Sequence, residues 1–202
     1  GINDSLGTSI SNAGDVNGDG FDDVIVSAPD ADSNGYNLGT SYVVFGKPSG
    51  FSAAFDLSSL NGKNGFRLDG TKAYDEAGSS VSNAGDVNGD GFEDVIVGAP
   101  YADSNGYDSG SSYVVFGKES GFSAAINLSN IDGKNGFRLD GALAGNSSGK
   151  SVSSAGDVNG DGFDDMIIGT RGTDSNDEHS HSSYVVFGRA SGFSAAMDLA
   201  SL

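Results

Sequence analysis

Short apolar runs separated by polar turns recur along this chain at a fixed interval. Runs at 24–26 and 43–45 are followed by runs of the same kind 71 and 142 residues later. They are rich in Val and Ile and are flanked by Gly, Asp and Asn, which is typical of β-strands bounded by turns. Val43, Val44 and Phe45 are consecutive rather than alternating with polar residues, so we expect both faces of such strands to be covered.

The interval defines three units of one 71-residue repeat, at 1–71, 72–142 and 143–202. In the first unit the pattern predicts four strands, near residues 8–14, 23–28, 41–46 and 65–69. The third unit lacks its last strand, because the counterpart of Phe66 and Phe137 would fall at position 208. The FSAAFDLSSL stretch of the first unit is compatible with a short helical turn.

Four short antiparallel strands per unit, repeated in tandem, predict an all-β chain of β-propeller blades. A linear stack of β modules is the alternative architecture. Propellers usually have four to eight blades, so three blades leave two open faces. Either these units belong to a longer propeller or several chains form a homo-oligomer that completes a ring. Open blade faces and unpaired strand edges are both association sites.

An acidic nine-residue loop lies between the first two predicted strands of every unit. The formal charge of the chain is −18, and 12 of its 28 acidic residues lie in these three loops. Such clustering favours a counter-ion, and three Ca²⁺ ions would reduce the charge from −18 to −12. The loop reads D-V-N-G-D-G-F-[DE]-D, with oxygen-bearing side chains at positions 1, 3, 5 and 9 and Gly at position 6.

Ca²⁺ takes six to eight hard oxygen ligands, and Gly at position 6 allows the positive φ of a sharp turn. We therefore predict three Ca²⁺ sites, each using four side chains and the carbonyl oxygen of the Phe at position 7. An Asx-rich turn without metal is the simpler interpretation of one such loop, but three copies in register favour the metal. The predicted ligands are Asp15, Asn17, Asp19, Phe21 and Asp23; Asp86, Asn88, Asp90, Phe92 and Asp94; and Asp157, Asn159, Asp161, Phe163 and Asp165.

Other metal sites fit the sequence less well. Position 12 of each loop falls in a predicted strand, where an EF-hand requires Glu and a flanking helix. The chain has no Cys and two His, so zinc and iron ligands are scarce. The acidic residue at position 8 is Asp22, Glu93 or Asp164, and we expect it to point away from the ion, either into the outer shell or into solvent.

Further classes of function are disfavoured by charge and composition. A polyanion does not attract nucleic acid, and no apolar run is long enough to span a membrane. No nucleophile and base form a repeated pair, so we expect no enzyme activity and no catalytic residue. His179 and His181 could grip a metal, although a diverged surface loop explains them more simply. Tyr36 and Tyr107 could stack on a sugar or peptide, but loop packing is the commoner role.

The repeat resembles the FG-GAP repeat, the blade of the integrin α-chain N-terminal propeller and of related bacterial proteins. Phe-Gly occurs at 45–46, 116–117 and 187–188, and Gly-Ala-Pro occurs at 98–100, with Ser-Ala-Pro at 27–29. The third unit departs from the Gly-Ala-Pro pattern, because it has Gly169-Thr170-Arg171 at that place. The resemblance covers essentially the whole chain. It implies a seven-bladed ring and Ca²⁺ bound in a DxDxDGxxD loop on one face.

These patterns predict a secreted or cell-surface module for protein interaction or adhesion, with structural Ca²⁺ and a protein or glycan ligand. Millimolar Ca²⁺ outside cells matches the low affinity expected of extracellular sites. The alternatives are an accessory propeller domain of a secreted hydrolase and a self-assembling structural element. Near-identity of the units and the absence of Cys favour a bacterial origin.

Overall fold

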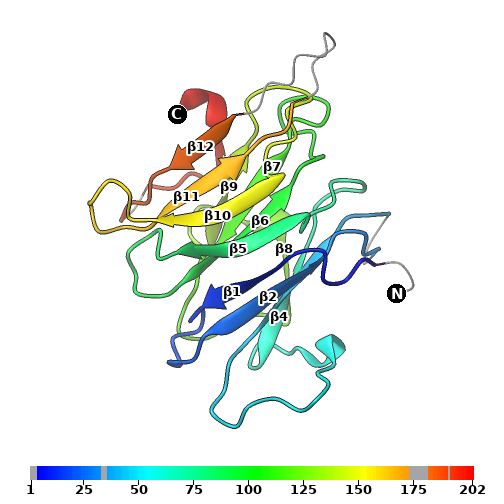
Figure 1. The fold of residues 1–202 in the computed structure, drawn as a ribbon, viewed down its shortest axis with the longest axis vertical. Helices are drawn as coiled ribbons and strands as arrows, with labels where there is room; N and C mark the ends of the chain where they lie inside the picture. The colour runs from blue at the N-terminus through cyan, green and yellow to red at the C-terminus, as the bar shows by residue number, and fades with distance from the viewer. Residues whose placement is uncertain (1–3, 33–35, 173–181, 191) are drawn as a thin grey trace.

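The computed structural model describes residues 4–32, 36–172, 182–190 and 192–202, and short strands dominate it (Figure 1). Each repeat forms a small antiparallel sheet, here called a blade. The first blade contains β1 Ile10–Gly14, β2 Asp23–Ala28, β3 Thr40–Val44 and β4 Gly65–Asp69. The second contains β5 Ser80–Gly85, β6 Asp94–Ala99, β7 Ser111–Val115 and β9 Gly136–Asp140, and the third contains β10 Ser151–Gly156, β11 Asp165–Gly169 and β12 Ser183–Val186.

The four strands expected in the first unit are confirmed, as is the short helical turn. That turn is a 3₁₀ helix at Leu57–Ser59, and its counterparts are Leu128–Asn130 and Leu199–Ser201. Asp56 caps the first of them, because its side chain accepts a hydrogen bond from the Ser58 backbone amide at 2.9 Å.

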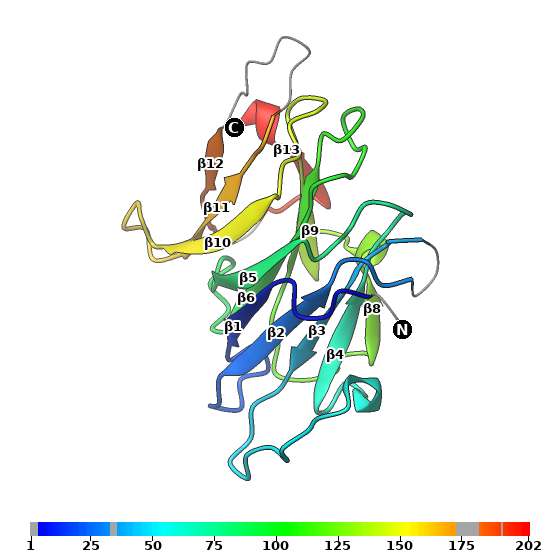
Figure 2. The ribbon, with the colours of Figure 1, turned by 45° about the vertical axis from the view of Figure 1, so that its right-hand side comes forward.

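Neighbouring blades meet along their first strands. β5 lies beside β1 on one side and beside β10 on the other (Figure 2). A serine hydroxyl joins each pair, since Ser9 Oγ accepts from the Val81 amide and Ser80 Oγ accepts from the Val152 amide, both at 3.1 Å. Contact along first strands, with the sheets extending outwards from it, is the arrangement of blades in a β-propeller.

The outer edge of each of the first two sheets carries a fifth strand from the following unit. β8 (Ala125–Asn127) pairs in parallel with β4, and β13 (Ala196–Asp198) pairs in parallel with β9. The sheets therefore have five, five and three strands, whereas the pattern predicted four per complete unit. A three-residue strand in a polar segment has too little apolar periodicity to be recognised from sequence.

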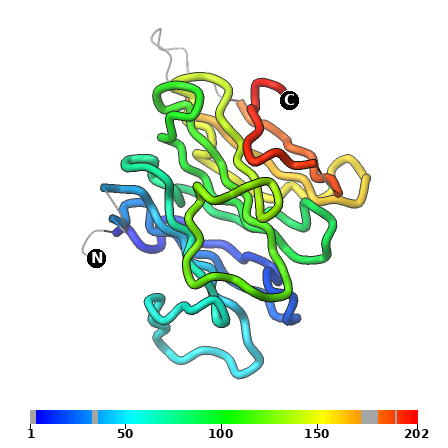
Figure 3. The backbone as a smooth tube through the Cα atoms, turned by 180° about the vertical axis from the view of Figure 1, so that it is seen from behind, coloured from blue at the N-terminus to red at the C-terminus, as the bar shows by residue number. Residues whose placement is uncertain are grey.

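The crossing segment that carries β8 is anchored by an aromatic side chain. Phe122 stacks on Phe66 with ring centroids 4.6 Å apart and meets the edge of Phe45 at 5.4 Å. Phe193 repeats this packing on Phe137, at 4.3 Å, in the next blade. The crossing segment, seen from behind in Figure 3, is thus packed against the preceding blade.

Each blade has two faces, and only the middle blade has both covered. In the first blade, Ile10 and Val24 lie on one face, which we call the leading face. Ile25 and Val43 lie on the other face, which we call the trailing face. The trailing face of the first blade packs on the leading face of the second, and the trailing face of the second packs on the leading face of the third. Every residue of β6 and β7 is buried, which confirms the prediction drawn from consecutive apolar residues.

The aromatic anchor gives a test of this packing. Phe122→Ala should lower the free energy of unfolding by about 3 kcal/mol, because it empties a buried site between Phe66 and Phe45. Phe51 is the matched control: it holds the same position in the first unit but is half exposed, so Phe51→Ala should cost less than about 1 kcal/mol. Chemical denaturation of both variants measures the difference. Equal losses would contradict the role of the crossing segment.

Candidate metal centre

The three acidic loops share most of their internal hydrogen bonds. At the first position, Asp15 accepts from the amides of Asp19 at 3.0 Å and Gly20 at 2.8 Å. Gly20 has φ +86°, a conformation that suits glycine and that the sequence predicted at position 6. Asp86 and Asp157 accept the corresponding amides within 0.1 Å of these lengths. The first carboxylate therefore folds the loop around itself, with or without an ion.

The aspartate at position 9 is turned into the protein. Asp23 is buried and accepts two backbone hydrogen bonds, from Val16 at 3.0 Å and from Gly46 at 2.8 Å. Gly46 is the glycine of the Phe-Gly motif at the end of β3. Asp94 and Asp165 make the same pair of bonds, to Val87 and Gly117 and to Val158 and Gly188. One carboxylate thus ties the acidic loop to the third strand of its blade.

This contact explains why glycine occupies the second position of the Phe-Gly motif. A Cβ atom on Gly117 would lie 2.4 Å from the carbonyl oxygen of Glu93 and 2.9 Å from that of Val16. Gly46 and Gly188 are equally crowded by the loop of their own blade. In the sequence, the acidic loop and the Phe-Gly motif are separate. The signal that they are in contact was that both repeat three times at the same spacing.

Burial and neighbouring charge raise the pKa of the ninth carboxylate in the first two loops. Burial raises the pKa of Asp23 to about 6 and that of Asp94 to about 8, against the lowering effect of the two backbone hydrogen bonds. Negative charge on the first and fifth positions of the same loop adds to the rise. Backbone hydrogen bonds, the one from Gly162 first, lower the pKa of the first-position carboxyl Asp157. The loop therefore holds like charges close enough to repel.

The donor set fits a hard cation. Positions 1, 5 and 9 are coupled electrostatically, and their oxygens suit Ca²⁺ better than a soft metal. Within the part of the chain that the structure describes, no three acidic or histidine side chains already surround one point at metal-binding distance. Asn17 uses its amide to donate to Asp19 Oδ2 at 3.0 Å, so it must rotate to present oxygen to an ion. The structure thus brings the predicted residues into one loop without closing a coordination shell.

The remaining predicted ligands are the Phe residues at position 7. Their amides donate to the fifth-position carboxylate at 3.0 Å in all three loops. The rings of Phe92 and Phe163 extend to the preceding blade: a Cβ on Gly18 would lie 2.4 Å from the Phe92 ring, and one on Gly89 would lie 2.3 Å from the Phe163 ring. Glycine at position 4 of one loop therefore makes room for Phe at position 7 of the next.

In the second and third blades, the acidic residue at position 8 joins adjacent loops. Asp164 Oδ2 accepts from the amide of Asp86, the first residue of the preceding loop, at 2.9 Å, while the Asp164 amide donates back to Asp86 O at 3.2 Å. The Glu93 amide likewise donates to Asp15 O at 3.3 Å. Sequence reasoning missed this contact because position 8 has no partner within its own loop.

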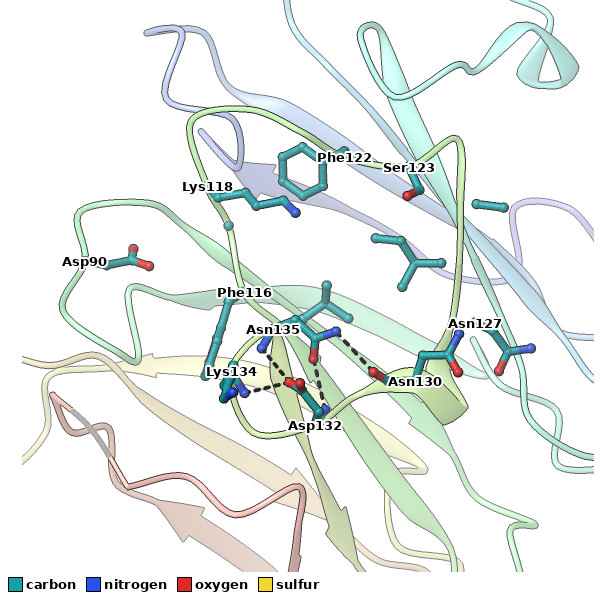
Figure 4. A pocket seen from close by; sticks show the side chains of 14 residues that line it. Asp90, Phe116, Lys118, Phe122, Ser123, Asn127, Asn130, Asp132, Lys134 and Asn135 are labelled. Carbon is teal, nitrogen blue, oxygen red and sulfur yellow. Dashed lines mark hydrogen bonds between the residues drawn. The ribbon is translucent and has the colours of Figure 1, made fainter.

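A hollow of about 480 Å³ lies below the crossing segment of the second unit, with Asp90 at its border (Figure 4). Its polar side chains mostly hold their own turn. Asp132 accepts from the Lys134 amide at 2.9 Å, and Asn135 donates to the Asn130 carbonyl at 3.1 Å. These hydrogen bonds fix the turn that borders the hollow.

The opposite ends of the second strands carry exposed tyrosines. Tyr36 and Tyr107 follow β2 and β6 and are among the most exposed aromatic side chains described. Tyr36 stacks on Tyr74 with centroids 6.4 Å apart, which agrees with the loop-packing interpretation for that residue. His179 and His181 lie outside the described residues. Across the described ranges, no helix is long and apolar enough to cross a bilayer.

Comparison with known proteins agrees with the resemblance seen in the motifs. The FG-GAP repeat model matches residues 6–44, 77–115 and 148–186. Integrin alpha-PS5 of Drosophila melanogaster is 33% identical over 163 residues, which is 80% of this chain and 14% of that protein. Integrin alpha-4 of Xenopus laevis is 32% identical over 81% of the chain, and integrin alpha-IIb of Homo sapiens is 32% identical over 78%; each match covers 14% of the relative. These relatives are animal proteins, and the bacterial origin stays a prediction.

Without metal, replacing the buried carboxylate of a loop should destabilise the fold more than replacing an exposed carboxylate of the same loop. In a chelator, Asp94→Ala should lower the free energy of unfolding by about 2–4 kcal/mol, because the amides of Val87 and Gly117 lose their buried acceptor. The matched variant Asp90→Ala removes an exposed carboxylate from the same loop and should cost less than about 1 kcal/mol. Urea unfolding in EGTA compares them. If both variants lose an equally small amount of unfolding free energy, the ninth aspartate does not anchor the blade.

Proposed function

The chain belongs to the FG-GAP repeat family, and we propose that it is a propeller module for extracellular protein interaction or adhesion with structural Ca²⁺. The observation that carries the metal assignment is the loop itself, built three times around the same carboxylate hydrogen bonds, with carboxylates that repel one another in the first two copies. The integrin alpha relatives support the extracellular setting and the interaction role. Because the chain spans 14% of those relatives, their whole activity is not transferred to it.

The role of Ca²⁺ in this proposal is to stabilise the blade. Asp15, Asn17, Asp19, the Phe21 carbonyl and Asp23 would hold the ion in the first loop, and the matching residues would hold it in the others. An ion there supplies positive charge where like charges repel, and it fixes the turn between the first two strands. At extracellular affinities of about 10⁻⁴–10⁻³ M, tenfold saturation stabilises the fold by roughly 1.4 kcal/mol per site.

Interlocking loops extend this effect beyond a single blade. The ring of Phe92 and the amide of Glu93 contact the first loop, and Phe163 and Asp164 contact the second. An ion that orders one loop also fixes the surface on which the next loop rests. Stabilisation by Ca²⁺ is therefore expected to act on the packing of neighbouring blades as well as on the loops themselves.

Thermal unfolding with Ca²⁺ and with EGTA tests the metal assignment. Three sites at about 1.4 kcal/mol each should raise the melting temperature by roughly 10 °C at pH 8. The rise should be smaller at pH 6. Metal requires the ionised carboxylate, and protons compete for Asp94, whose pKa is about 8, and for Asp23, whose pKa is about 6. Affinity for Ca²⁺ thus increases as the pH rises through these values.

A triple variant serves as the control for that measurement. Asp19, Asp90 and Asp161 are exposed and hold little of the blade, so replacing all three by Ala should leave a folded protein that no longer responds to Ca²⁺. Mg²⁺ at the same concentration should stabilise the wild type less, because it prefers a stricter octahedron. A wild-type melting temperature that Ca²⁺ leaves unchanged would rule out structural sites in these loops.

The interaction role has its own test. The folded, Ca²⁺-loaded chain, displayed on a surface, should bind at least one member of a panel of extracellular matrix proteins and glycans. The triple variant should lose most of that binding at a temperature where it is less ordered. Wild-type protein that binds nothing on the panel, while Ca²⁺ still stabilises it, would contradict the interaction role and leave the metal assignment intact.

A further inference from the structure

The third and fourth positions of every acidic loop form an Asn-Gly dipeptide, at 17–18, 88–89 and 159–160. Glycine after asparagine has no side chain to hinder the approach of its backbone nitrogen to Cγ, the side-chain carbonyl carbon of the asparagine. Attack at Cγ closes a five-membered succinimide ring and expels ammonia. Water then opens the ring at either of its two carbonyl groups and leaves aspartate or isoaspartate. Position 3 therefore has a possible chemistry of its own, apart from metal binding.

The second loop places hydrogen-bonding groups at the three atoms that take part in this reaction. The amide of Gly89, whose nitrogen is the nucleophile, donates to Asp86 Oδ1 at 2.7 Å. The side-chain oxygen of Asn88, on which negative charge develops, accepts from the Asp90 amide at 2.8 Å. The side-chain nitrogen of Asn88, which leaves as ammonia, donates to Asp90 Oδ2 at 3.0 Å.

Each of these contacts matches a proton or charge that moves. As a bond forms between the Gly89 nitrogen and Asn88 Cγ, the Asp86 carboxylate is placed to accept the proton of that nitrogen as a general base. The Asp90 amide stabilises the oxygen that becomes negative in the tetrahedral intermediate. The bond from Cγ to the side-chain nitrogen then breaks, and the transferred proton leaves with that nitrogen as ammonia. Ring closure needs no other reagent, and ring opening consumes one water molecule.

The third loop repeats all three contacts. The Gly160 amide donates to Asp157 Oδ1 at 2.7 Å, and the Asn159 side-chain oxygen accepts from the Asp161 amide at 2.9 Å. The Asn159 side-chain nitrogen donates to Asp161 Oδ2 at 2.9 Å. Two loops of this chain thus have the same arrangement around the same dipeptide.

The first loop keeps the contacts of the asparagine but not that of the glycine. Asn17 accepts from the Asp19 amide at 2.9 Å and donates to Asp19 Oδ2 at 3.0 Å. Asp15 accepts the amides of Asp19 and Gly20, and among the described residues no hydrogen bond joins it to Gly18. The first loop is therefore a natural comparison in which the carboxylate does not contact the nucleophile.

We propose that Asn88 and Asn159 are sites of deamidation that their own loops promote while no metal is bound, and that Ca²⁺ suppresses the reaction. The second clause rests on the proposed function, because the side-chain oxygens that make these contacts are also the proposed ligands. An ion would draw the carboxylate away from the glycine amide and turn the asparagine oxygen towards itself. The reaction would therefore mark loops that have stayed without metal.

The two products would change the loop in opposite ways. Aspartate adds a carboxylate at position 3, and a higher charge on the ligands strengthens the binding of Ca²⁺. Isoaspartate lengthens the backbone by one carbon and so changes the spacing between positions 1 and 5. Deamidation would thus turn one population of metal-free loops into stronger sites and another into damaged ones.

An Asn-Gly dipeptide outside the loops serves as an internal control. The Asn135 side chain accepts from the Asp132 amide at 3.0 Å and donates to the Asn130 carbonyl at 3.1 Å. Both partners precede it in the chain, and Gly136 begins β9. The folded protein should therefore slow deamidation of Asn135 relative to the unfolded chain, whereas it should accelerate that of Asn88.

Peptide mapping by mass spectrometry tests the proposal. The full chain is kept in EGTA at neutral pH, sampled over days and digested, and the same chain unfolded in urea gives the reference rate for each dipeptide. In the folded protein, Asn88 and Asn159 should deamidate at least about tenfold faster than in urea, since general-base and oxyanion contacts accelerate acyl transfer by such factors. Asn17 should react more slowly than Asn88. Slow reaction of Asn135 confirms that the EGTA sample is folded.

A variant of the base separates promotion by the loop from mere accessibility. Asp157→Asn should lower the rate at Asn159 about tenfold or more, because the amide that replaces the carboxylate does not accept the proton. Asn88 in the same molecule keeps its own base and should react at the wild-type rate, which makes it the matched control. Asp86→Asn, with Asn159 as its control, is the reciprocal variant, and it takes the place of Asp157→Asn if that protein does not fold.

Two results would overturn the promotion of deamidation by the loop. Asn88 and Asn159 could react no faster in the folded chain than in urea, or the base variants could leave the rate in their own loop unchanged. Either result would show that the hydrogen bonds do not assist the reaction.

The Ca²⁺ arm has a separate outcome. Ca²⁺ at about ten times its dissociation constant should slow deamidation of Asn88 about tenfold, because the metal-free fraction falls by that factor. A melting temperature that rises with Ca²⁺ while the rate at Asn88 stays the same would overturn the suppression and leave the metal assignment intact. If Ca²⁺ changes neither quantity, the metal assignment itself fails, and the comparison in EGTA still decides whether the loop promotes deamidation.

Discussion

The buried carboxylate at the ninth position of each acidic loop is the interaction on which the blade depends. It accepts one amide from its own loop and one from the Phe-Gly turn, so it fixes the loop, the start of the second strand and the end of the third strand together. The two amides bind separate oxygens of the carboxyl group, and Asn at this position would offer one acceptor oxygen instead of two. Both family motifs therefore meet at one side chain, and the glycine of the second is required by its proximity to the first.

That arrangement has an electrostatic consequence. Burial disfavours the ionised form, and the first and fifth carboxylates of the same loop add repulsion, which is why the pKa of Asp94 reaches about 8. Protonation relieves the repulsion at low pH, and a bound cation would relieve it at higher pH. The structural role of the aspartate and the proposed role of the metal are thus linked: the group that holds the strands together also creates the charge that an ion would balance.

Most of the fold follows from the repeat in the sequence. Val and Ile runs spaced by 71 residues predict the strands, and consecutive apolar residues predict a blade covered on both faces, as β6 and β7 are. The fifth strand was not predictable, because Ala125–Asn127 has only three residues and pairs with a strand of another unit. The contact made by position 8 was not predictable for the same physical reason. Asp164 finds its partner on the neighbouring loop, and contacts between repeats leave no periodic signal within one repeat.

The candidate site shows the same division between local and non-local information. Loop spacing predicted the glycine with positive φ and the carboxylates that share a loop, because these are properties of nine consecutive residues. It did not predict how far the pKa of the ninth aspartate rises: the pKa of Asp94 in the middle blade reaches about 8, and that of Asp23 in the first blade reaches about 6. The middle blade packs on a neighbouring blade at each face, whereas the first blade packs on one at its trailing face. Burial is the largest cause of the rise in both loops, so packing of the blade and charge within the loop act on the same carboxylate.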